Sequence, residues 1–183
     1  MDYKTYIFTK KCNNGCIFCT RSFTPVPERD TEEVKRDLKK IRENGARNII
    51  LTGGEPAIHD NFLEILRYCK KTGFRNVSIQ TNGRMFSYRD FTEKTVEILG
   101  ERLDVFLSFH THRKKIYRKL TRQKGFEQVI KGIKNLLERD VNVRTNTVVM
   151  KPNYRDIPET MKFISEIGIK NSDLMWIHPR GRA

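Results

Sequence analysis

The chain has 183 residues, with 36 Lys and Arg against 22 Asp and Glu, which gives a formal net charge of +14. This length predicts one domain with its own core, and no apolar run reaches the ~18 residues of a membrane span, so no membrane partner is expected. The positive excess favours an anionic partner, either a phosphorylated small molecule, a nucleic acid or an acidic peptide, but it is equally typical of an ion-rich surface.

Strand and helix patterns alternate along the chain. A strand over 4–9 leads into a cysteine-rich loop, and a helix then begins after the capping residue Asp30 and ends at Asn44-Gly45. Further strands are expected over 48–51, 77–80, 105–109, 141–150 and 174–177. Further helices are expected from Asp60 or Asn61 and over 88–99, 126–139 and 157–167, whereas 113–124 is expected to be a loop.

This series of about six strand–helix repeats predicts one α/β domain over residues 1–183, with a parallel sheet and outer helices. Right-handed crossovers leave two arrangements open, an open doubly wound sheet or a barrel-like arc. In both arrangements ligands bind at the carboxyl ends of the strands.

Three cysteines follow the first strand in a C-x3-C-x2-C spacing, Cys12, Cys16 and Cys19. The loop contains no fourth Cys and no His, whereas a structural zinc site takes four protein ligands. A [4Fe–4S] cluster held by three cysteines leaves one iron open for a substrate or cofactor. The cysteines do not form a disulfide framework and the N-terminus lacks a signal-peptide core, so we expect a cytoplasmic protein.

Polar or glycine-rich motifs follow the later strands. Gly53-Gly54 after the second strand lets the backbone approach a ligand closely, and Glu55 offers an acceptor for an ammonium group. The third strand is followed by Gln80-Thr81-Asn82-Gly83 and the fourth by Ser108 and His110. Cys69 lies on an apolar helix face and is expected in the core.

With these motifs in this order, the chain resembles the radical S-adenosylmethionine (SAM) enzymes, and most closely the branch of molybdenum-cofactor and peptide-modifying enzymes. The cysteine loop resembles the family's cluster motif, and Thr52 to Pro56 resembles the motif that binds the methionine amino group. The resemblance covers essentially the whole chain. It implies a partial, open TIM-like (β/α)6 barrel of parallel strands with outer helices.

The resemblance also implies roles for individual residues. Cys12, Cys16 and Cys19 are expected to ligate a [4Fe–4S] cluster that reductively cleaves SAM to a 5′-deoxyadenosyl radical, with a flavodoxin or ferredoxin as reductant. The expected SAM contacts are Phe18, Gly53, Gly54, Glu55, Ser108, Asn146 and His178. Arg144 and His110 are the candidates for contact with a small-molecule, peptide or nucleotide substrate.

The basic run from Arg113 to Lys124 leads to the hypothesis of an anionic substrate, against the alternative of a solvated basic face. Two other functions stay open: a glycyl-radical-enzyme activase, and a basic nucleic-acid-binding module whose zinc ion is completed by His59 or His110. No cysteine follows Cys69, so no auxiliary-cluster domain is expected. A closing helix is expected after the sixth strand, so we expect a minimal or truncated member, with a partner subunit at an uncovered edge strand.

Overall fold

The structure, a computed structural model, describes residues 3–21, 28–178 and 181–182. Six strands form one sheet: β1 (Tyr3–Thr9), β2 (Asn48–Gly53), β3 (Asn76–Thr81), β4 (Leu103–Ser108), β5 (Asn142–Val149) and β6 (Asn171–Trp176). The helices are α1 (Thr31–Glu43), α2 (Phe62–Thr72), α3 (Arg89–Leu99), α4 (Lys114–Thr121), α5 (Phe126–Leu137) and α6 (Ile157–Glu166). No helix in the described ranges is long and apolar enough to cross a membrane.

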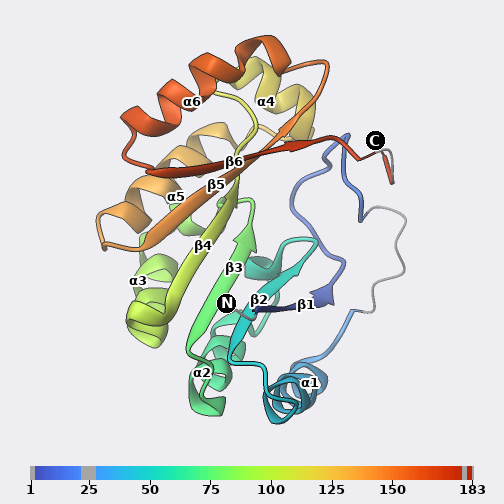
Figure 1. Cartoon of the computed structure of the whole chain (residues 1–183), viewed down its shortest axis with the longest axis vertical. Helices are drawn as coiled ribbons and strands as arrows, with labels where there is room; N and C mark the ends of the chain where they lie inside the picture. Colours follow the sequence, from blue (N-terminus) through green and yellow to red (C-terminus); the bar gives the residue numbers. More distant parts are fainter. Residues whose placement is uncertain (1–2, 22–27, 179–180, 183) are drawn as a thin grey trace.

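The strand order decides between the two expected arrangements. All neighbours pair in parallel, and the order in the sheet is β1-β2-β3-β4-β5-β6, the order of the sequence. A doubly wound sheet requires a point at which the strand order reverses, and this sheet has none. Right-handed crossovers without reversal place every helix on one face, so the sheet curves into an open barrel arc with its helices outside (Figure 1). The predicted partial (β/α)6 barrel is confirmed.

Alternation along the strands separates an apolar outer face from a more polar inner face. Pairs of fully buried residues such as Ile49 and Leu51 on β2 and Val105 and Leu107 on β4 face the helices and form the core. The alternate strand positions face the barrel interior. They include apolar Ile50 and Phe106 and the polar residues Ser78, Gln80, Asp104, Ser108, Arg144 and Asn146. The sequence therefore keeps a polar interior open to ligands.

Local signals in the sequence account for most of the helix boundaries. Asp30 and Glu33 form a reciprocal capping box at the start of α1, as the sequence predicts. The prediction of a loop over 113–124 is wrong, because Lys114–Thr121 is the helix α4, which buries Tyr117, Leu120 and Thr121. Its start at Arg113 has no side-chain cap, and the dense basic residues hide the apolar spacing of its buried face.

The strand β6 lies at the edge of the sheet and begins three residues earlier than the expected Leu174. Its polar start, Asn171-Ser172-Asp173, pairs with β5 at Arg144, Thr145 and Asn146. All six residues of β6 are exposed, and Trp176 keeps 78% of its surface accessible. An uncovered edge of this kind matches the expectation of a partner subunit, which stays a prediction.

Candidate active site

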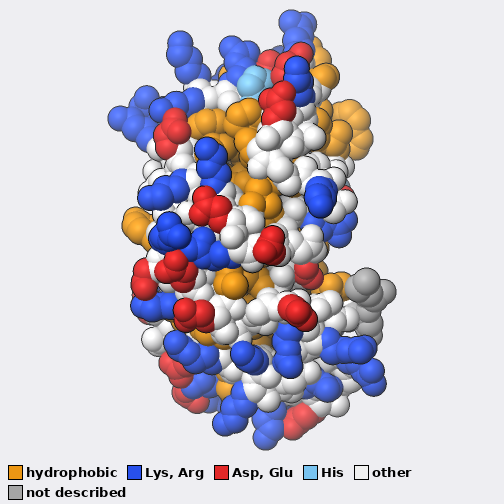
Figure 2. Space-filling view, turned by 90° about the vertical axis from the view of Figure 1, so that its left-hand side faces the viewer, with side chains coloured by type: hydrophobic (Ala, Val, Ile, Leu, Met, Phe, Trp, Pro, Cys, Tyr) orange, Lys and Arg blue, Asp and Glu red, His pale blue; other side chains and the backbone are white. Residues whose placement is uncertain are grey.

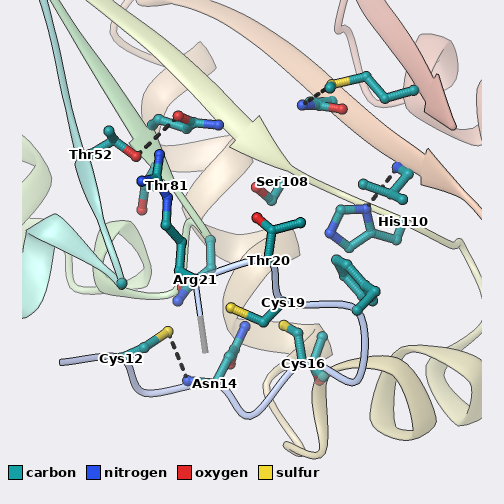
Figure 3. Close-up of a pocket in the computed structure, with 18 of the residues that line it drawn as sticks. Cys12, Asn14, Cys16, Cys19, Thr20, Arg21, Thr52, Thr81, Ser108 and His110 are labelled. Atoms are coloured by element: carbon teal, nitrogen blue, oxygen red, sulfur yellow. Dashed lines mark hydrogen bonds between the residues drawn. The ribbon is translucent and has the colours of Figure 1, made fainter. Parts of the chain in front are cut away.

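The carboxyl ends of the strands surround a cavity of about 270 Å³ (Figure 3). It contains most of the site residues expected from the sequence: Cys12, Cys16, Phe18, Cys19, Gly53, Gly54, Ser108, His110, Asn146 and His178. Two expected residues, Glu55 and Arg144, do not line it. The motifs after separate strands therefore converge on one space, as parallel strands in sequence order require.

The three cysteines lie on the loop that follows β1, and their sulfur atoms point from the loop to the same side (Figure 3). All three are free thiols. Burial raises the pKa of Cys16 to about 12, with smaller contributions from the neighbouring Cys12 and Cys19, and burial also raises the pKa of Cys12. Ligation by thiolates in this loop therefore has to release protons, which couples cluster binding to pH.

In the described ranges, no three His, Cys, Asp or Glu side chains converge closely enough to hold a single metal ion. The three thiols instead surround a shared space. Neither His59 nor His110 joins the cysteines in such a group of ligands among the described residues. His59 Nε2 contacts the carbonyl of Arg29 at 3.1 Å, and His110 Nδ1 accepts a hydrogen bond from the Val148 amide at 3.2 Å.

The glycines of the second motif hold the start of the cysteine loop in place. The Gly54 amide donates to the Thr9 carbonyl at 2.8 Å, and the Glu55 amide donates to the Lys11 carbonyl at 2.8 Å. A Cβ atom on Gly54 would overlap the carbonyl oxygens of Lys10 and Lys11. These two amides thus form hydrogen bonds with the end of β1 and the start of the loop. Glycine is required here because the two backbones approach too closely to leave room for a Cβ atom.

Glu55 is buried, 1% exposed, and points away from the cavity. Its Oε1 accepts from the Thr81 hydroxyl at 2.7 Å and the Ala57 amide at 3.1 Å, and its Oε2 accepts from the Asn82 amide at 2.6 Å. Burial raises the pKa of Glu55, and these three donors oppose the shift. The carboxylate therefore ties the turn after β2 to the turn after β3 and is not presented to a ligand.

Arg84, which the sequence analysis did not single out, fastens the cysteine loop to the barrel. Its Nη1 donates to the Asn13 carbonyl at 2.5 Å and to the Asn14 Oδ1 at 3.0 Å, and its Nε donates to Gln128 at 2.8 Å. Asn82 adds a hydrogen bond of 2.6 Å to the Asn13 side chain. The sequence shows the Asn82-Gly83 turn after β3. It gives no local sign that the next residue, Arg84, contacts Asn13 and Asn14, which lie 71 and 70 residues earlier in the chain.

Polar side chains from adjacent strands form one wall of the cavity. Ser108 and Asn146 are register partners on β4 and β5, and Thr52 donates to Gln80 at 3.0 Å across β2 and β3. Asn146 Nδ2 donates to the Met175 sulfur at 3.0 Å, whereas its Oδ1 is buried without a partner among the described residues. A buried acceptor left unpaired beside a cavity suits a ligand that brings a donor.

His110 and Phe18 pack together at the back of the cavity. Their ring centroids are 4.6 Å apart and the rings lie edge to face at 80°. Burial lowers the pKa of His110 to about 4, so its imidazole is neutral near pH 7. With Nδ1 accepting from Val148, the remaining proton resides on Nε2.

The basic residues of the cavity differ from those expected. Arg21 is the single Lys or Arg that lines it in the described part of the chain. Arg144 lies on the inner face of β5, two residues before Asn146, with its guanidinium 5.5 Å from the Phe106 ring centroid and its Nε buried without a partner in the described ranges. From the basic run 113–124, only Thr121 lines the cavity.

The comparisons with known proteins agree with this site. The family model of the radical SAM superfamily matches residues 6–164. The chain belongs to the radical SAM superfamily. Members of this superfamily are enzymes that use a [4Fe–4S] cluster and SAM, so the predicted family, enzyme class and cofactors are confirmed. A match of this extent is not expected of a zinc module that shares only the cysteine spacing.

Among curated proteins, the chain is similar to probable GTP 3′,8-cyclases. The identity is 30% over 176 residues with the Sulfurisphaera tokodaii protein, covering 94% of this chain and 55% of that one. It is 32% over 183 residues with the Saccharolobus solfataricus protein, covering 94% and 56%. The chain thus spans about half the length of these relatives.

Solved structures share the fold. Streptococcus suis SuiB bound to S-adenosylmethionine has a TM-score of 0.80 at 23% identity, covering 97% of this chain and 41% of that chain. Methylornithine synthase (PylB) has a TM-score of 0.78 at 18% identity, covering 99% and 55%. The protein named anSMEcpe, with bound AdoMet, has a TM-score of 0.77 at 18% identity, covering 96% and 51%.

Proposed function

We propose that Cys12, Cys16 and Cys19 ligate a [4Fe–4S] cluster in this chain and that SAM binds in the cavity beside it. The observation that carries the proposal is that the three thiols and the polar wall open onto the same cavity. Thiolates are the ligands that such clusters take, and three of them leave one iron for SAM. The unpartnered Asn146 Oδ1 on the opposite wall suits the hydroxyl or amino groups of a nucleoside.

When bound, the cluster and SAM would supply one-electron cleavage of the sulfonium C–S bond and, through it, abstraction of a hydrogen atom from the substrate. The residues of the chain position these groups and exclude water. We assign Ser108 and Asn146 to the methionine or ribose part of SAM, and Phe18 and the His178 backbone to the adenine. Gly53 and Gly54 shape the turn that supports the cluster loop, with Glu55 holding that turn from behind.

The finer proposal is that the substrate is an anionic nucleotide. The relatives named probable GTP 3′,8-cyclase support this class, and so do two basic side chains. Arg21 lines the cavity, and Arg144 has an unpaired buried Nε on the inner wall below Asn146. A guanidinium group in such a position suits phosphate or a purine edge. His110 is assigned to hold Phe18, because its ring is buried and its Nδ1 is already engaged.

The test is anaerobic reconstitution with iron and sulfide, followed by mass spectrometry for 5′-deoxyadenosine in dithionite-reduced protein. SAM cleavage is expected, and addition of GTP is expected to stimulate it more than addition of guanosine. Cys16→Ser should abolish it, whereas Cys69→Ser, at a buried thiol in the core of α2, should retain it. An intact cluster without SAM cleavage contradicts the function, and equal stimulation by GTP and guanosine contradicts the anionic substrate.

The glycyl-radical-enzyme activase stays a prediction that the same assay tests. In that case cleavage would be stimulated by a protein fraction of a cell extract and not by its small molecules. Arg144→Met would then leave SAM cleavage unchanged, because a nucleotide contact would play no part.

A further inference from the structure

The helix α4 carries the strongest concentration of positive charge beside the cysteine loop. The segment 113–124 contains seven Lys and Arg residues and no Asp or Glu. Lys115, Arg118 and Lys119 follow helical spacing and share one exposed face, while Tyr117 and Leu120 are buried on the other. Arg122, the left-handed C-cap residue just after the helix, is exposed as well. Figure 2 shows Lys and Arg side chains over the whole face that it draws, at both ends of the molecule, so charge alone does not single out α4, which lies at the upper end in Figure 1.

Most of this charge has no internal counter-charge. Arg113 pairs with Asp156 at 3.2 Å and Lys114 with Glu127 at 2.8 Å. Lys115, Arg118, Lys119, Arg122 and Lys124 form no ion pair with any described residue. Their charges are therefore available to an outside partner.

The C-terminal end of α4 forms backbone hydrogen bonds with the segment that carries Cys16. The Gly15 amide donates to the Thr121 carbonyl at 2.8 Å, and the Ile17 amide donates to the Leu120 carbonyl at 2.9 Å. A Cβ on Gly15 would lie 3.6 Å from the Cβ of Arg122. The cysteine loop thus packs along the C-terminal end of α4, whose last residue, Thr121, also lines the cavity. The basic face is outside the cavity but adjacent to the thiols.

A redox site on this loop needs electrons from a protein that docks close to it. The last turn of α4 forms hydrogen bonds with the backbone on both sides of Cys16, so a protein bound to the exposed face of α4 would lie close to this cysteine. Weak redox complexes are small and are guided by opposite charges, which raise the association rate without a large apolar contact. The unpaired basic face suits an acidic carrier in both charge and position.

We propose that the exposed face of α4 formed by Lys115, Arg118 and Lys119, together with the C-cap residue Arg122, docks an acidic one-electron-donor protein. The donor passes one electron through the Cys16 segment to the cluster, the donor is oxidised by one electron and the cluster is reduced by one. This inference rests on the proposed function, because it requires a cluster at the three cysteines. It assigns the basic face to the reductant and not to the substrate.

The test compares two triple charge reversals with reduced flavodoxin, an acidic flavoprotein, as the probe. The α4 variant is Lys115→Glu, Arg118→Glu and Lys119→Glu. The control is Arg36→Glu and Lys40→Glu on α1 with Lys71→Glu on α2, which are exposed, form no ion pair with a described residue and lie at the opposite end of the molecule (Figure 1). Both variants change the net charge equally.

Two readouts separate docking from catalysis. The dissociation constant for flavodoxin, measured by fluorescence anisotropy at ~20 mM salt, should rise ~10-fold or more in the α4 variant only, and ~300 mM salt should remove the difference. The flavodoxin-supported rate of cluster bleaching should fall in parallel, while the dithionite-supported rate stays unchanged. Equal binding by both variants overturns the proposal, and so does an equal loss with dithionite, which would indicate a role in substrate binding or folding. If neither reductant gives SAM cleavage, the proposed function fails, and the binding measurement still decides the docking surface.

Discussion

The Arg84 guanidinium donates a 2.5 Å hydrogen bond to the carbonyl of Asn13, inside the loop that carries the three cysteines. Arg84 stands just after β3, and its Nε is held by Gln128 of α5. One side chain thereby connects the cysteine loop, the end of a strand and an outer helix. The loop contains no regular secondary structure of its own, so its shape depends on such contacts.

Arg84→Ala should loosen the cysteine loop. The variant loses hydrogen bonds from a charged donor to two loop groups and to Gln128, which predicts a fall of about 2 to 3 kcal/mol in the free energy of unfolding. We expect less iron and sulfide bound per chain after reconstitution, with a lower melting temperature. Arg89→Ala, which removes an exposed pair with Glu93 on α3, is the control and should change stability by less than about 1 kcal/mol. Full cluster loading in the Arg84 variant would contradict the role of this contact.

Gly54→Ala should distort the junction between β1 and β2. Its Cβ would overlap the backbone carbonyls of Lys10 and Lys11, which cannot move without shifting Cys12. We expect a destabilisation of about 2 to 4 kcal/mol by urea denaturation, because overpacking against backbone has no flexible side chain to absorb it. Gly45→Ala, at a positive φ of 92° but with open space around it, should cost only about 1 kcal/mol. Equal costs for the two variants would argue against the close approach.

Glu55→Gln should act through stability and not through direct contact with SAM. The amide nitrogen of Gln cannot accept the bond from Asn82, so either that amide or the pair with Thr81 and Ala57 is lost. We expect about 1 to 3 kcal/mol of destabilisation, since the site is buried. Titration of SAM into reconstituted protein should show affinity within a few-fold of the wild type. A total loss of SAM binding in a stably folded variant would indicate that Glu55 contacts SAM directly.

The neutral, buried His110 should make the fold sensitive to acid. Burial lowers the pKa of His110 from 6.5 to about 4. At a pH between these two pKa values, the unfolded chain binds a proton at His110 that the folded chain does not. The free energy of unfolding therefore rises with pH in this range, and the stabilisation from neutral His110 is fully present above pH 6.5. Lowering the pH to ~4 should reduce the free energy of unfolding by up to about 3 kcal/mol through the protonation of this group.

Urea denaturation of the cluster-free protein between pH ~4 and ~7 measures this effect. His110→Gln should flatten the pH dependence relative to the wild type. Phe109→Leu, at the neighbouring buried ring, should lower stability by a similar amount at every pH and so keep the wild-type slope. A wild-type slope in the His110 variant would mean that other groups carry the acid sensitivity.

Most secondary-structure elements follow from local pattern. The capping box at Asp30 and Glu33, the apolar face of α2 and the short apolar strands are visible because their signals lie within one or two turns of chain. The helix α4 was missed although Ile116, Tyr117 and Leu120 have helical spacing, since its start is uncapped and basic residues dominate it. The first three residues of β6 were missed because they are polar and owe their conformation to pairing with β5.

The sequence by itself predicted the kind of chemistry, because the spacing of Cys12, Cys16 and Cys19 and the order of the later motifs resemble the radical SAM enzymes, the family that the chain belongs to. It also determined which motif follows which strand, since strand periodicity is local. Only the tertiary structure decided that Glu55 faces away from the cavity, that Arg84 holds the cysteine loop and that α4 lies against the loop's outer side. These depend on contacts such as that of Asn13 with Asn82, 69 residues apart, and no local periodicity encodes which distant donor and acceptor meet. The loop that carries the three cysteines is thus held on one side by the barrel, through Arg84 and Asn82, and on the other by the basic helix α4.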